Sequence, residues 1–357
     1  MVVYFLIDRI AGIFIWKEVW QLVDRRSFDG GEVHVYFFKS NVDNVASRNV
    51  GNCHYVKVFE TEPLLNFSHP YTVFYNRTNQ SLAELNQDGV ALVLNNQGKL
   101  VPTPVRATVQ DGDPQAWDVG IVMRSSPTNR GANAFSVNTP KNDDLAQTWA
   151  SWGPYMSEYA GLEDCLDSSE ILILQCTSAG LAYILDFAFF MQKRGSSKKM
   201  PAVHVLLSTR SFELIQWASG VLRPMIDHYG WQLHARFTQA EGTLTEMREG
   251  PAQQEFRQRF SISSDSLDDL LETLSKLHVQ IRPKVFFCGD PLIQWAAEVT
   301  AANYDAEFFR GSRFSAVGFP LFTRGRDKKL RCFACPKMRK GKKQVCWCNA
   351  FPLPIFY

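Results

Sequence analysis

The sequence lacks the features that mark several familiar classes of protein. Its charge is nearly balanced, with 38 Lys and Arg against 36 Asp and Glu, which disfavours a wholly basic nucleic-acid binder. Its 8 cysteines are too few over 357 residues for a small disulfide scaffold. Hydrophobic residues make up 45% and charged residues 21%, which disfavours disorder. The composition therefore indicates a globular protein, long enough for two domains of roughly 100–200 residues each.

The N-terminus lacks both a signal-peptide cleavage site and an unbroken apolar span. Its apolar residues are interrupted by Asp8, Arg9, Lys17 and Glu18, whereas about 20 apolar residues are needed to cross a bilayer. We predict an amphipathic helix over residues 1–26 instead. The residues that would share one face of it are Phe5, Ile10, Ile13, Trp16 and Trp20. That face would pack on the protein core or lie at a membrane surface, and both alternatives stay open.

One long apolar run is present, residues 171–191, with Asp186 as its only charged residue. A hydropathy window would assign it to a membrane. The run divides into a β-like piece at Ile171–Leu174, a turn of small residues at Thr177–Gly180, and a helix-like piece. We therefore predict a buried strand that leads into a buried helix.

Two patterns follow each other along the chain. Short β-branched and aromatic runs between turn residues predict an antiparallel, Greek-key β-barrel over residues 27–160, with the boundary inside the polar stretch 140–159. Over residues 161–314, strand-like runs alternate with helix-length segments, which predicts an α/β domain with a parallel sheet. Residues 315–357 form a basic, Cys-containing tail.

The first specific motif is His69, Pro70, Tyr71 and Thr72. It resembles the His-Pro-Phe-Thr flavin motif of the ferric reductase and NADPH oxidase family, in its ferredoxin-NADP reductase-like region that binds FAD and NAD(P)H. The resemblance implies that Tyr71 lies against the isoalloxazine ring, that Thr72 hydrogen-bonds near flavin N5, and that His69 faces the pyrophosphate. Without the resemblance, the segment is an ordinary turn at a strand edge.

Two further motifs follow in the family's order. Val119–Arg124 resembles a strand that ends in a basic residue near the flavin phosphates. Arg124 is therefore either an anion contact or a solvated strand end. Gly153 and Tyr155, on either side of Pro154, resemble the Gly-Pro-Tyr-Gly turn that closes the family's flavin domain, with Met156 in place of the last glycine.

The turn after Ile171–Leu174 departs from the family's Gly-x-Gly-x-x-Pro pattern. Ser178 and Tyr183 replace the first glycine and the proline, and only Gly180 is kept. A helix N-terminus behind such a turn can hold a pyrophosphate. Ser178 can still hydrogen-bond a phosphate, although its Cβ narrows the approach. A plain strand-to-helix connection in a domain that has lost its nucleotide explains the turn equally well.

Two later strand ends extend the resemblance. Arg210 stands where the family's Ser or Arg meets the ribose phosphate of NADPH, and a guanidinium binds phosphate bidentately. Cys288 and Gly289 resemble a Cys-Gly-Pro turn whose cysteine lies near the nicotinamide, with Asp290 in place of the proline. The resemblance thus makes Thr72 and Cys288 the predicted catalytic residues. Read alone, Cys288 is a buried packing cysteine.

The resemblance implies a flavin-dependent oxidoreductase that passes electrons from NADPH through FAD to iron, haem or oxygen. The altered Ser178 and Tyr183 favour an alternative, a catalytically impaired member that serves as an interaction module. The 7 histidines are scattered singly, with no paired histidines on long apolar helices. The resemblance therefore implies a membrane or haem-bearing membrane partner, and a place at the cytosolic face of a membrane.

Four thiols in the tail form a further candidate site: Cys332, Cys335, Cys346 and Cys348. The first pair has a usual zinc-ligand spacing, whereas the second pair is closer than in a zinc ribbon. A zinc site and unpaired thiols both stay open. A basic, zinc-stapled tail would also bind nucleic acid, which is the weaker alternative function.

Overall fold

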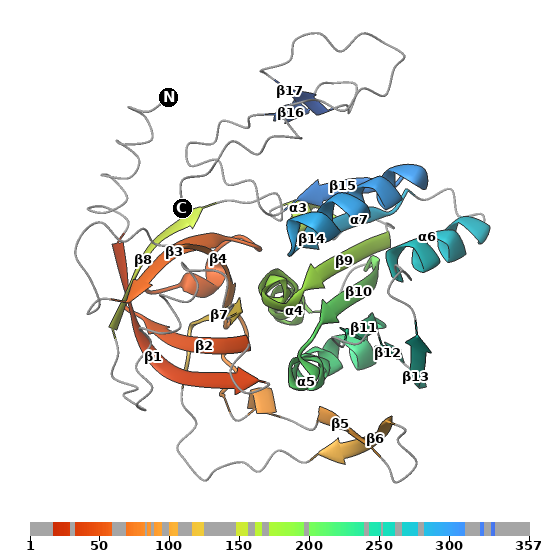
Figure 1. The fold of residues 1–357 in the computed structure, drawn as a ribbon. Helices are drawn as coiled ribbons and strands as arrows, with labels where there is room; N and C mark the ends of the chain where they lie inside the picture. The colour runs from red at the N-terminus through yellow and green to blue at the C-terminus, as the bar shows by residue number, and fades with distance from the viewer. Residues whose placement is uncertain are drawn as a thin grey trace.

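The structure is a computed structural model, and two sheets with their helices dominate it (Figure 1). The residues that it describes are 17–28, 33–58, 69–82, 84–86, 89–94, 100–105, 116–124, 148–155, 161–165, 171–195, 200–238, 243–250, 253–260, 266–277, 282–310, 322–324 and 330–332.

A closed antiparallel barrel forms the first unit, with the strand order β1-β2-β7-β4-β3-β8. Its strands are β1 (Lys17–Phe28), β2 (Val33–Ser40), β3 (Cys53–Val58), β4 (His69–Tyr75), β7 (Val119–Arg124) and β8 (Thr148–Tyr155). Large aromatic side chains fill the interior, among them Trp20, Tyr36, Phe38 and Trp149. Because successive side chains of a strand point to opposite faces, Phe37 and Phe74 lie on the outside of the barrel, in a different cluster. The predicted barrel is confirmed.

Strand β1 corrects one of the sequence predictions. Residues 17–26, expected in an amphipathic helix, belong to β1, and Trp20 is buried inside the barrel, where its Nε1 donates to Glu18 at 3.0 Å. The apolar residues of this stretch fit the spacing of a helix as well as that of a strand, and pairing with β2 and β8 decides for the strand. Strand β8 lies within the range 27–160 that was predicted for the barrel. Residues 1–16 lie outside the described part of the chain.

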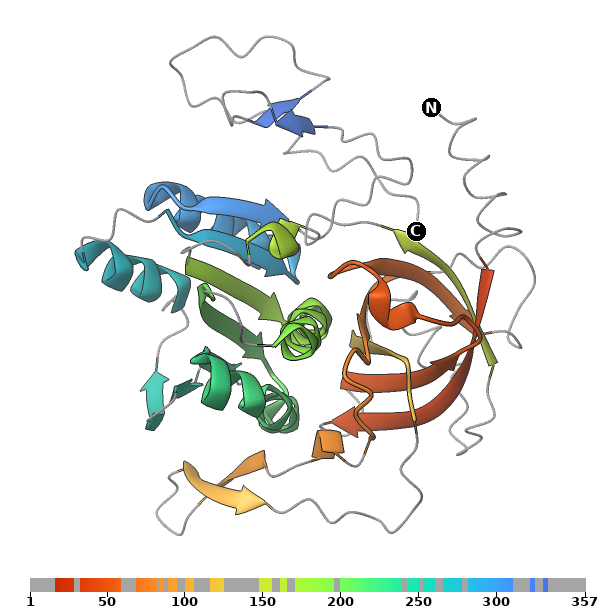
Figure 2. The ribbon, with the colours of Figure 1, turned by 180° about the vertical axis from the view of Figure 1, so that it is seen from behind.

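Two small hairpins lie apart from the barrel. Strands β5 (Gly89–Leu94) and β6 (Leu100–Val105) pair with each other and not with the barrel. The sequence pattern had placed β5 among the barrel strands. They lie beside α5 in both ribbon views (Figure 2). The second hairpin joins β16 (Phe322–Arg324) and β17 (Leu330–Cys332).

A sheet with the order β13-β12-β11-β10-β9-β14-β15 forms the second unit. Its strands are β9 (Ile171–Thr177), β10 (Ala202–Thr209), β11 (Gln232–Thr238), β12 (Thr243–Gly250), β13 (Gln253–Phe260), β14 (Lys284–Cys288) and β15 (Glu307–Arg310). The pairs from β11 through β10, β9 and β14 to β15 are parallel, whereas β12 and β13 are antiparallel additions. The predicted two-domain class, a barrel followed by a mainly parallel α/β sheet, is confirmed.

Helices cover both faces of this sheet. Helices α4 (Leu181–Arg194) and α5 (Phe212–Tyr229) share one cluster with β9 and β10, and α6 (Ser266–Lys276) and α7 (Pro291–Asn303) share another on the opposite face. A short helix, α3 (Gly161–Asp164), precedes β9, and the 3₁₀ turns are η2 (Val45–Ser47), η3 (Glu84–Asn86) and η5 (Ser178–Gly180).

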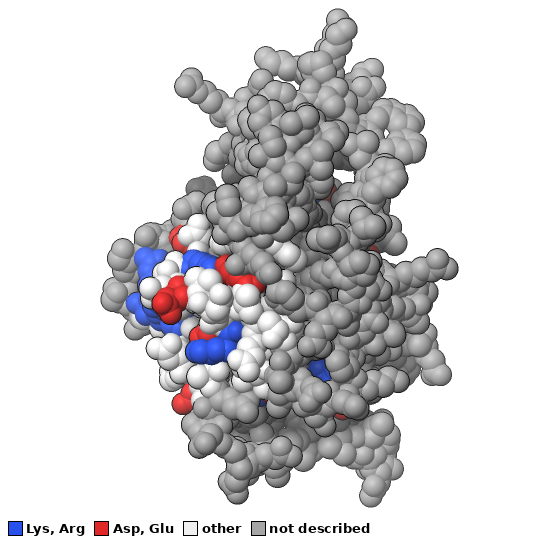
Figure 3. Space-filling model, turned by 90° about the vertical axis from the view of Figure 1, so that its left-hand side faces the viewer, with Lys and Arg blue, Asp and Glu red and all other residues white. Residues whose placement is uncertain are grey.

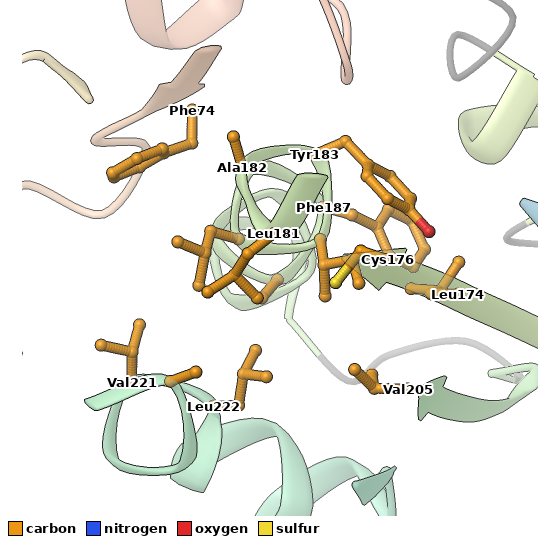
Figure 4. Packing of buried hydrophobic residues seen from close by; sticks show 14 of the residues in the cluster. Phe74, Leu174, Cys176, Leu181, Ala182, Tyr183, Phe187, Val205, Val221 and Leu222 are labelled. Atoms are coloured by element: carbon orange, nitrogen blue, oxygen red, sulfur yellow. The ribbon is translucent and has the colours of Figure 1, made fainter. Parts of the chain in front are cut away.

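The apolar run 171–191 forms β9, the η5 turn and most of α4, as the sequence predicts. Helix α4 is buried almost all round because the sheet lies on one side of it and the outer face of the barrel on the other (Figure 4). Among the described residues, no helix is long and apolar enough to cross a membrane.

The barrel and the sheet unit share one hydrophobic cluster. Phe74 of β4 lies with its ring centroid 6.2 Å from that of Phe189 on α4, and Trp117 lies 5.9 Å from the same ring. Gly120 on β7 leaves room for this packing, because a Cβ there would lie 2.0 Å from Cζ of Phe74. The outer face of the barrel and the sheet unit are therefore packed on each other in one hydrophobic cluster.

A buried ion pair crosses the same interface. Arg77, which follows β4, donates from Nε and Nη2 to the two carboxylate oxygens of Asp186 on α4, both at 3.0 Å. The backbone N–H groups of Gly51 and Tyr75 donate to the same carboxylate at 2.9 and 3.0 Å. The side chains of Arg77 and Asp186 are 1% and 0% exposed. Because its remaining donors reach backbone carbonyls of residues 46, 48 and 49, the guanidinium is well satisfied.

On the barrel side of the molecule, the described surface mixes Lys and Arg with Asp and Glu (Figure 3). This mixture agrees with the near balance of charge in the whole sequence.

Candidate functional site

The candidate site lies at the carboxyl ends of β9 and β14. From β9, the sheet continues through β10 on one side and through β14 on the other, so the strand order reverses between them. Open α/β sheets bind ligands at such a reversal, outside the carboxyl ends of the strands. The η5 turn follows β9, and Gly289 follows β14. The structure thus brings together four residues of the predicted nucleotide site: Ser178, Gly180, Cys288 and Gly289.

These two turns approach each other so closely that glycine is required on both sides. A Cβ on Gly180 would lie 2.2 Å from the carbonyl oxygen of Cys288, and one on Gly289 would lie 2.0 Å from Oγ1 of Thr177. The same Thr177 Oγ1 accepts a hydrogen bond from the N–H of Asp290 at 3.0 Å. The glycines that the sequence singles out therefore allow the backbones to pack.

Ser178 has a positive φ of 38°, in the region that favours glycine. Its Oγ lies 3.0 Å from Oγ1 of Thr209 at the end of β10, a hydrogen bond that either hydroxyl can donate. The backbone N–H of Ser211 also donates to Thr209, and the Ser211 side chain caps α5 by accepting from Leu214 N–H at 3.0 Å. The serine that replaces the family's glycine is thus already engaged, and a phosphate would have to share its hydroxyl.

Tyr183 has a structural task at the same place. Its hydroxyl donates to the carbonyl oxygens of Gln175 and Phe286 at 3.1 and 2.9 Å, so that it bridges β9 and β14 next to their carboxyl ends. Burial raises the pKa of its phenol, and Cys176 and Cys288 add to the effect. The residue that stands where the family has proline therefore holds the two strands together.

The predicted flavin residues lie on β4, facing this region from the barrel. Tyr71 is partly exposed, and its ring packs against the barrel interior, where burial raises the pKa of the phenol. Thr72 points the other way, and its Oγ1 lies 3.7 Å from Sγ of Cys53 on β3. His69 and Pro70 begin the same strand.

Cys53 lies on the barrel side of the site, beside Thr72. Burial raises the pKa of its thiol, hydrogen bonding with Thr72 acts against this, and Cys288 raises the pKa further. Of the two predicted catalytic residues, Thr72 thus contacts this thiol within the barrel, and Cys288 lies at the end of β14 in the sheet unit. We call the residues that meet here the thiol half of the interface: Cys53, Thr72, Cys176, Ser178 and Cys288.

The remaining predicted residues lie at strand ends. Arg124 and Arg210 are exposed at the ends of β7 and β10. Gly153 is buried in β8, where a Cβ would come within 2.8 Å of Nδ1 of His54. Tyr155 pairs with Cys53 in the barrel register.

The zinc prediction receives no support from the described residues, which contain no group of three or more His, Cys, Asp or Glu that could hold a metal. Cys332 ends β17, while Cys335, Cys346 and Cys348 lie outside the described residues.

Sequence reasoning missed the residues that connect the two units. Asp186 carried a signal, because a lone acid in an apolar helix needs a buried partner. Its partner Arg77 carried none, and neither did Thr209 or Cys53, since their roles depend on contacts between distant strands.

The residues present fit FAD and NADPH in their chemistry. The first turn of α4 has no acidic residue and no side-chain cap, so its N–H groups suit an anion. Arg210 adds an exposed guanidinium at the end of the neighbouring strand, and Thr72 a hydroxyl from the barrel. The approach is narrow, because Leu181 and Ala182 are 0% exposed and the η5 turn packs on β7.

No protein-family model and no curated protein matches the sequence. Among solved structures, the chain is similar to a ferredoxin-NADP+ reductase from Plasmodium falciparum (TM-score 0.45, 12% identity, 82% of this chain and 95% of that one). It is also similar to a siderophore-interacting protein from Acinetobacter baumannii (0.45, 8%, 84% and 93%). A third match is the cytochrome b5 reductase domain of Ulva prolifera nitrate reductase (0.43, 10%, 82% and 96%). At these low values, function has to be argued from the residues of this chain.

Proposed function

We propose that this protein is a flavin-dependent NAD(P)H oxidoreductase whose reaction site is the thiol half of the interface. One observation carries the proposal: the barrel strands of the flavin motif pack on the turn and helix beside the nicotinamide motif. Strand β4, which holds Thr72, contacts α4, and the η5 turn, whose Gly180 lies against the backbone of Cys288, contacts β7. An enzyme that passes a hydride between two cofactors needs these two motifs to face each other.

The barrel would hold FAD. Thr72 would offer its hydroxyl to the flavin ring. Tyr71, which is partly exposed although it packs against the barrel interior, would contact the flavin through its exposed part. His69 and Arg124 stand at the ends of neighbouring strands of the same barrel, where they would meet the phosphates.

The sheet unit would hold NADPH. The uncapped start of α4 would face the pyrophosphate, and Arg210 the ribose phosphate. Gly180 and Gly289 let the two turns pack closely, and Cys288 would lie beside the nicotinamide. When bound, the cofactors supply hydride transfer from nicotinamide C4 to flavin N5 and then one-electron transfer to iron, haem or oxygen.

A membrane location at the cytosolic face is part of the proposal. It rests on the apolar residues 1–16 and on the family resemblance. The test is co-sedimentation with anionic vesicles, comparing the full chain with one that lacks residues 1–16. The deletion has to stop before Lys17, because β1 belongs to the barrel. A full chain that stays in the supernatant at low salt would contradict the location.

The function is tested by adding FAD to the purified full chain, removing free flavin, and recording the absorption spectrum before and after anaerobic NADPH. We expect bound flavin that NADPH bleaches. Thr72→Ala should weaken flavin binding, and Cys288→Ser should retain flavin but slow its reduction. Cys165→Ser is the matched control, because this buried cysteine lies near Lys284, at the opposite end of β14. A chain that binds no flavin would overturn the proposal.

A second candidate, the catalytically impaired interaction module, is favoured by one observation. The hydroxyl of Ser178 is engaged by Thr209, and its side chain stands in a turn that has a positive φ. The same experiment separates the two candidates. Bound flavin that NADPH does not reduce, but that dithionite does, would identify the impaired member.

A further inference from the structure

Cys176 and Cys288 are direct neighbours in the sheet. They are register partners on the parallel strands β9 and β14, at the carboxyl end of both. Neighbouring strands lie about 4.7–4.9 Å apart, and a disulfide accepts Cα separations of about 4.4–6.8 Å. The backbone therefore already holds these two cysteines within bonding range.

Both side chains also lie on the same face of the sheet. Cys176 belongs to the cluster between the sheet and α4, and Cys288 packs against the same cluster. Figure 4 shows Cys176 beneath Tyr183. The Tyr183 hydroxyl donates to the carbonyl oxygen of Gln175, just before Cys176, and to that of Phe286, two residues before Cys288. Burial raises the pKa of Cys176, and the neighbouring Cys288 raises it further.

The two thiols differ in access. Cys176 is 0% exposed, whereas Cys288 is only partly buried. An oxidant from solution therefore reaches Cys288 first, and Cys176 is its buried neighbour on β9. A partly exposed cysteine backed by a second thiol is the arrangement of redox-sensing pairs.

We propose that Cys176 and Cys288 form a reversible redox pair that a hydroperoxide oxidises to a disulfide joining β9 to β14. The thiolate of Cys288 attacks the O–O bond, takes one oxygen as a sulfenic acid, and releases the other as an alcohol or as water. The sulfur of Cys176 then attacks the sulfur of Cys288, and the displaced oxygen leaves as water with the proton of the Cys176 thiol. Two thiols lose two electrons and two protons, and the hydroperoxide takes up both.

Cys53 is the competing partner, because it is another buried cysteine of the thiol half that forms no disulfide. Its sulfur is held near Thr72 Oγ1 at 3.7 Å, and it belongs to a strand of the barrel that is not paired with β14. Register favours Cys176 over Cys53. The strand spacing lies within the range that a disulfide accepts, so the bond can form between the paired strands without moving the backbone.

The test is a peptide map of the full chain. The reduced protein is treated with hydrogen peroxide, its free thiols are alkylated, and it is digested with trypsin under non-reducing conditions. We expect a linked pair of peptides that carry Cys176 and Cys288 and have lost two hydrogen atoms, and that dithiothreitol separates. No Lys or Arg lies between Cys165 and Cys176, so one tryptic peptide holds both. The Cys165→Ser variant identifies the partner, and the link should persist in it.

A second variant makes the order of events visible. In Cys176→Ala, which keeps a small apolar side chain in the buried position, Cys288 has no resolving thiol. We expect its sulfenic acid to accumulate and to be trapped by dimedone. The peptide map described first uses the wild-type chain. It therefore tests the proposal even if the Cys176→Ala chain fails to fold. A Cys53–Cys288 link, or a fully oxidised Cys288 beside an alkylated Cys176, would overturn the proposal.

A functional consequence rests on the proposed function. With Cys288 tied to Cys176, its thiol no longer faces the nicotinamide position. We expect peroxide treatment to abolish NADPH-dependent flavin bleaching, and dithiothreitol to restore it. The peptide map needs no cofactor, so a disulfide without any flavin binding would overturn the proposed function and leave the redox pair standing.

Discussion

The interface between the barrel and the sheet unit has two halves of different character. The thiol half comprises Cys53, Thr72, Cys176, Ser178 and Cys288; the other, which we call the aromatic half, consists of Phe74, Arg77, Trp117, Asp186 and Phe189. The aromatic half is closely packed, and its buried charges are paired and fully hydrogen-bonded. The thiol half holds three cysteines that form no disulfide, a serine with positive φ, and two turns that touch through glycines.

The difference teaches how one interface can serve both stability and chemistry. Packed aromatic rings and a paired buried charge fix the relative position of the two units. The thiol half, held in place by the other, can then carry strain and reactive groups that would not stabilise an interface by themselves. Substitutions in the aromatic half should therefore change unfolding, and substitutions in the thiol half should change chemistry.

The largest effect is expected from Asp186→Ala. The substitution leaves the Arg77 guanidinium buried without its counter-charge and two backbone N–H groups without an acceptor. Breaking a buried pair in this way costs about 3–5 kcal/mol. Chemical denaturation should show this loss of unfolding free energy, and Asp186→Asn, which keeps an acceptor oxygen, should lose less.

The matched control is Glu272→Ala. Glu272 pairs with Lys276 on α6, and the two side chains are 50% and 71% exposed. Exposed pairs contribute roughly 0–1 kcal/mol. If both variants lost equally little, the buried pair would not be what holds the aromatic half together.

An intermediate effect is expected from Gly120→Ala on β7. The added Cβ would lie 2.0 Å from Cζ of Phe74, whose ring is fixed between the barrel and α4. Overpacking of this kind costs about 1–3 kcal/mol. Denaturation should show the loss, and the double variant Gly120→Ala with Phe74→Leu should recover part of it. Recovery is the deciding result, since a backbone effect at Gly120 would persist in the double variant.

A smaller effect on stability, with a larger one on chemistry, is expected from Ser178→Gly. Glycine relieves about 1–2 kcal/mol of strain at a positive φ, while the lost hydrogen bond to Thr209 costs about 0.5–1.5 kcal/mol, so the unfolding free energy should change little. The turn would gain room for a pyrophosphate, so flavin reduction by NADPH should speed up. Tyr183→Pro is the contrasting variant. It removes the bridge between β9 and β14 and should destabilise the protein.

The smallest effect is expected from Trp295→Ala on α7, outside both halves. Its side chain is 66% exposed, and surface substitutions usually stay within about 0.5 kcal/mol. Denaturation should show no clear change. A loss as large as that of Gly120→Ala would mean that the interface is not the main support of the fold.

Much of the fold follows from local patterns. Alternation predicts β2, β3, β4 and β7, and the change of period inside residues 171–191 predicts β9 and α4. Strands β1 and β8 could not be predicted, because residues 17–26 fit a helix as well as a strand, and Thr148–Tyr155 lies next to a polar stretch. In both, pairing with distant strands decides the outcome.

The candidate site shows the same division. Its glycines and Cys288 carry local motifs, and the structure brings them together at the reversal of strand order. Tyr183 and Arg77 act through hydrogen bonds to residues far along the chain. Tyr183 bonds to Phe286, and Arg77 bonds to Asp186. A single sequence without such contacts gives no sign of either.

The pairing of β1 with β8 bears on how the protein is made. Trp20 stands opposite Trp149 in this ladder, so the barrel cannot close until the chain has been synthesised past β8. At about 5–20 residues per second, β1 waits on the order of ten seconds with one edge unpaired. An open edge invites pairing with other chains. A chain that ends before Thr148 therefore keeps this edge of β1 open, and its barrel cannot close.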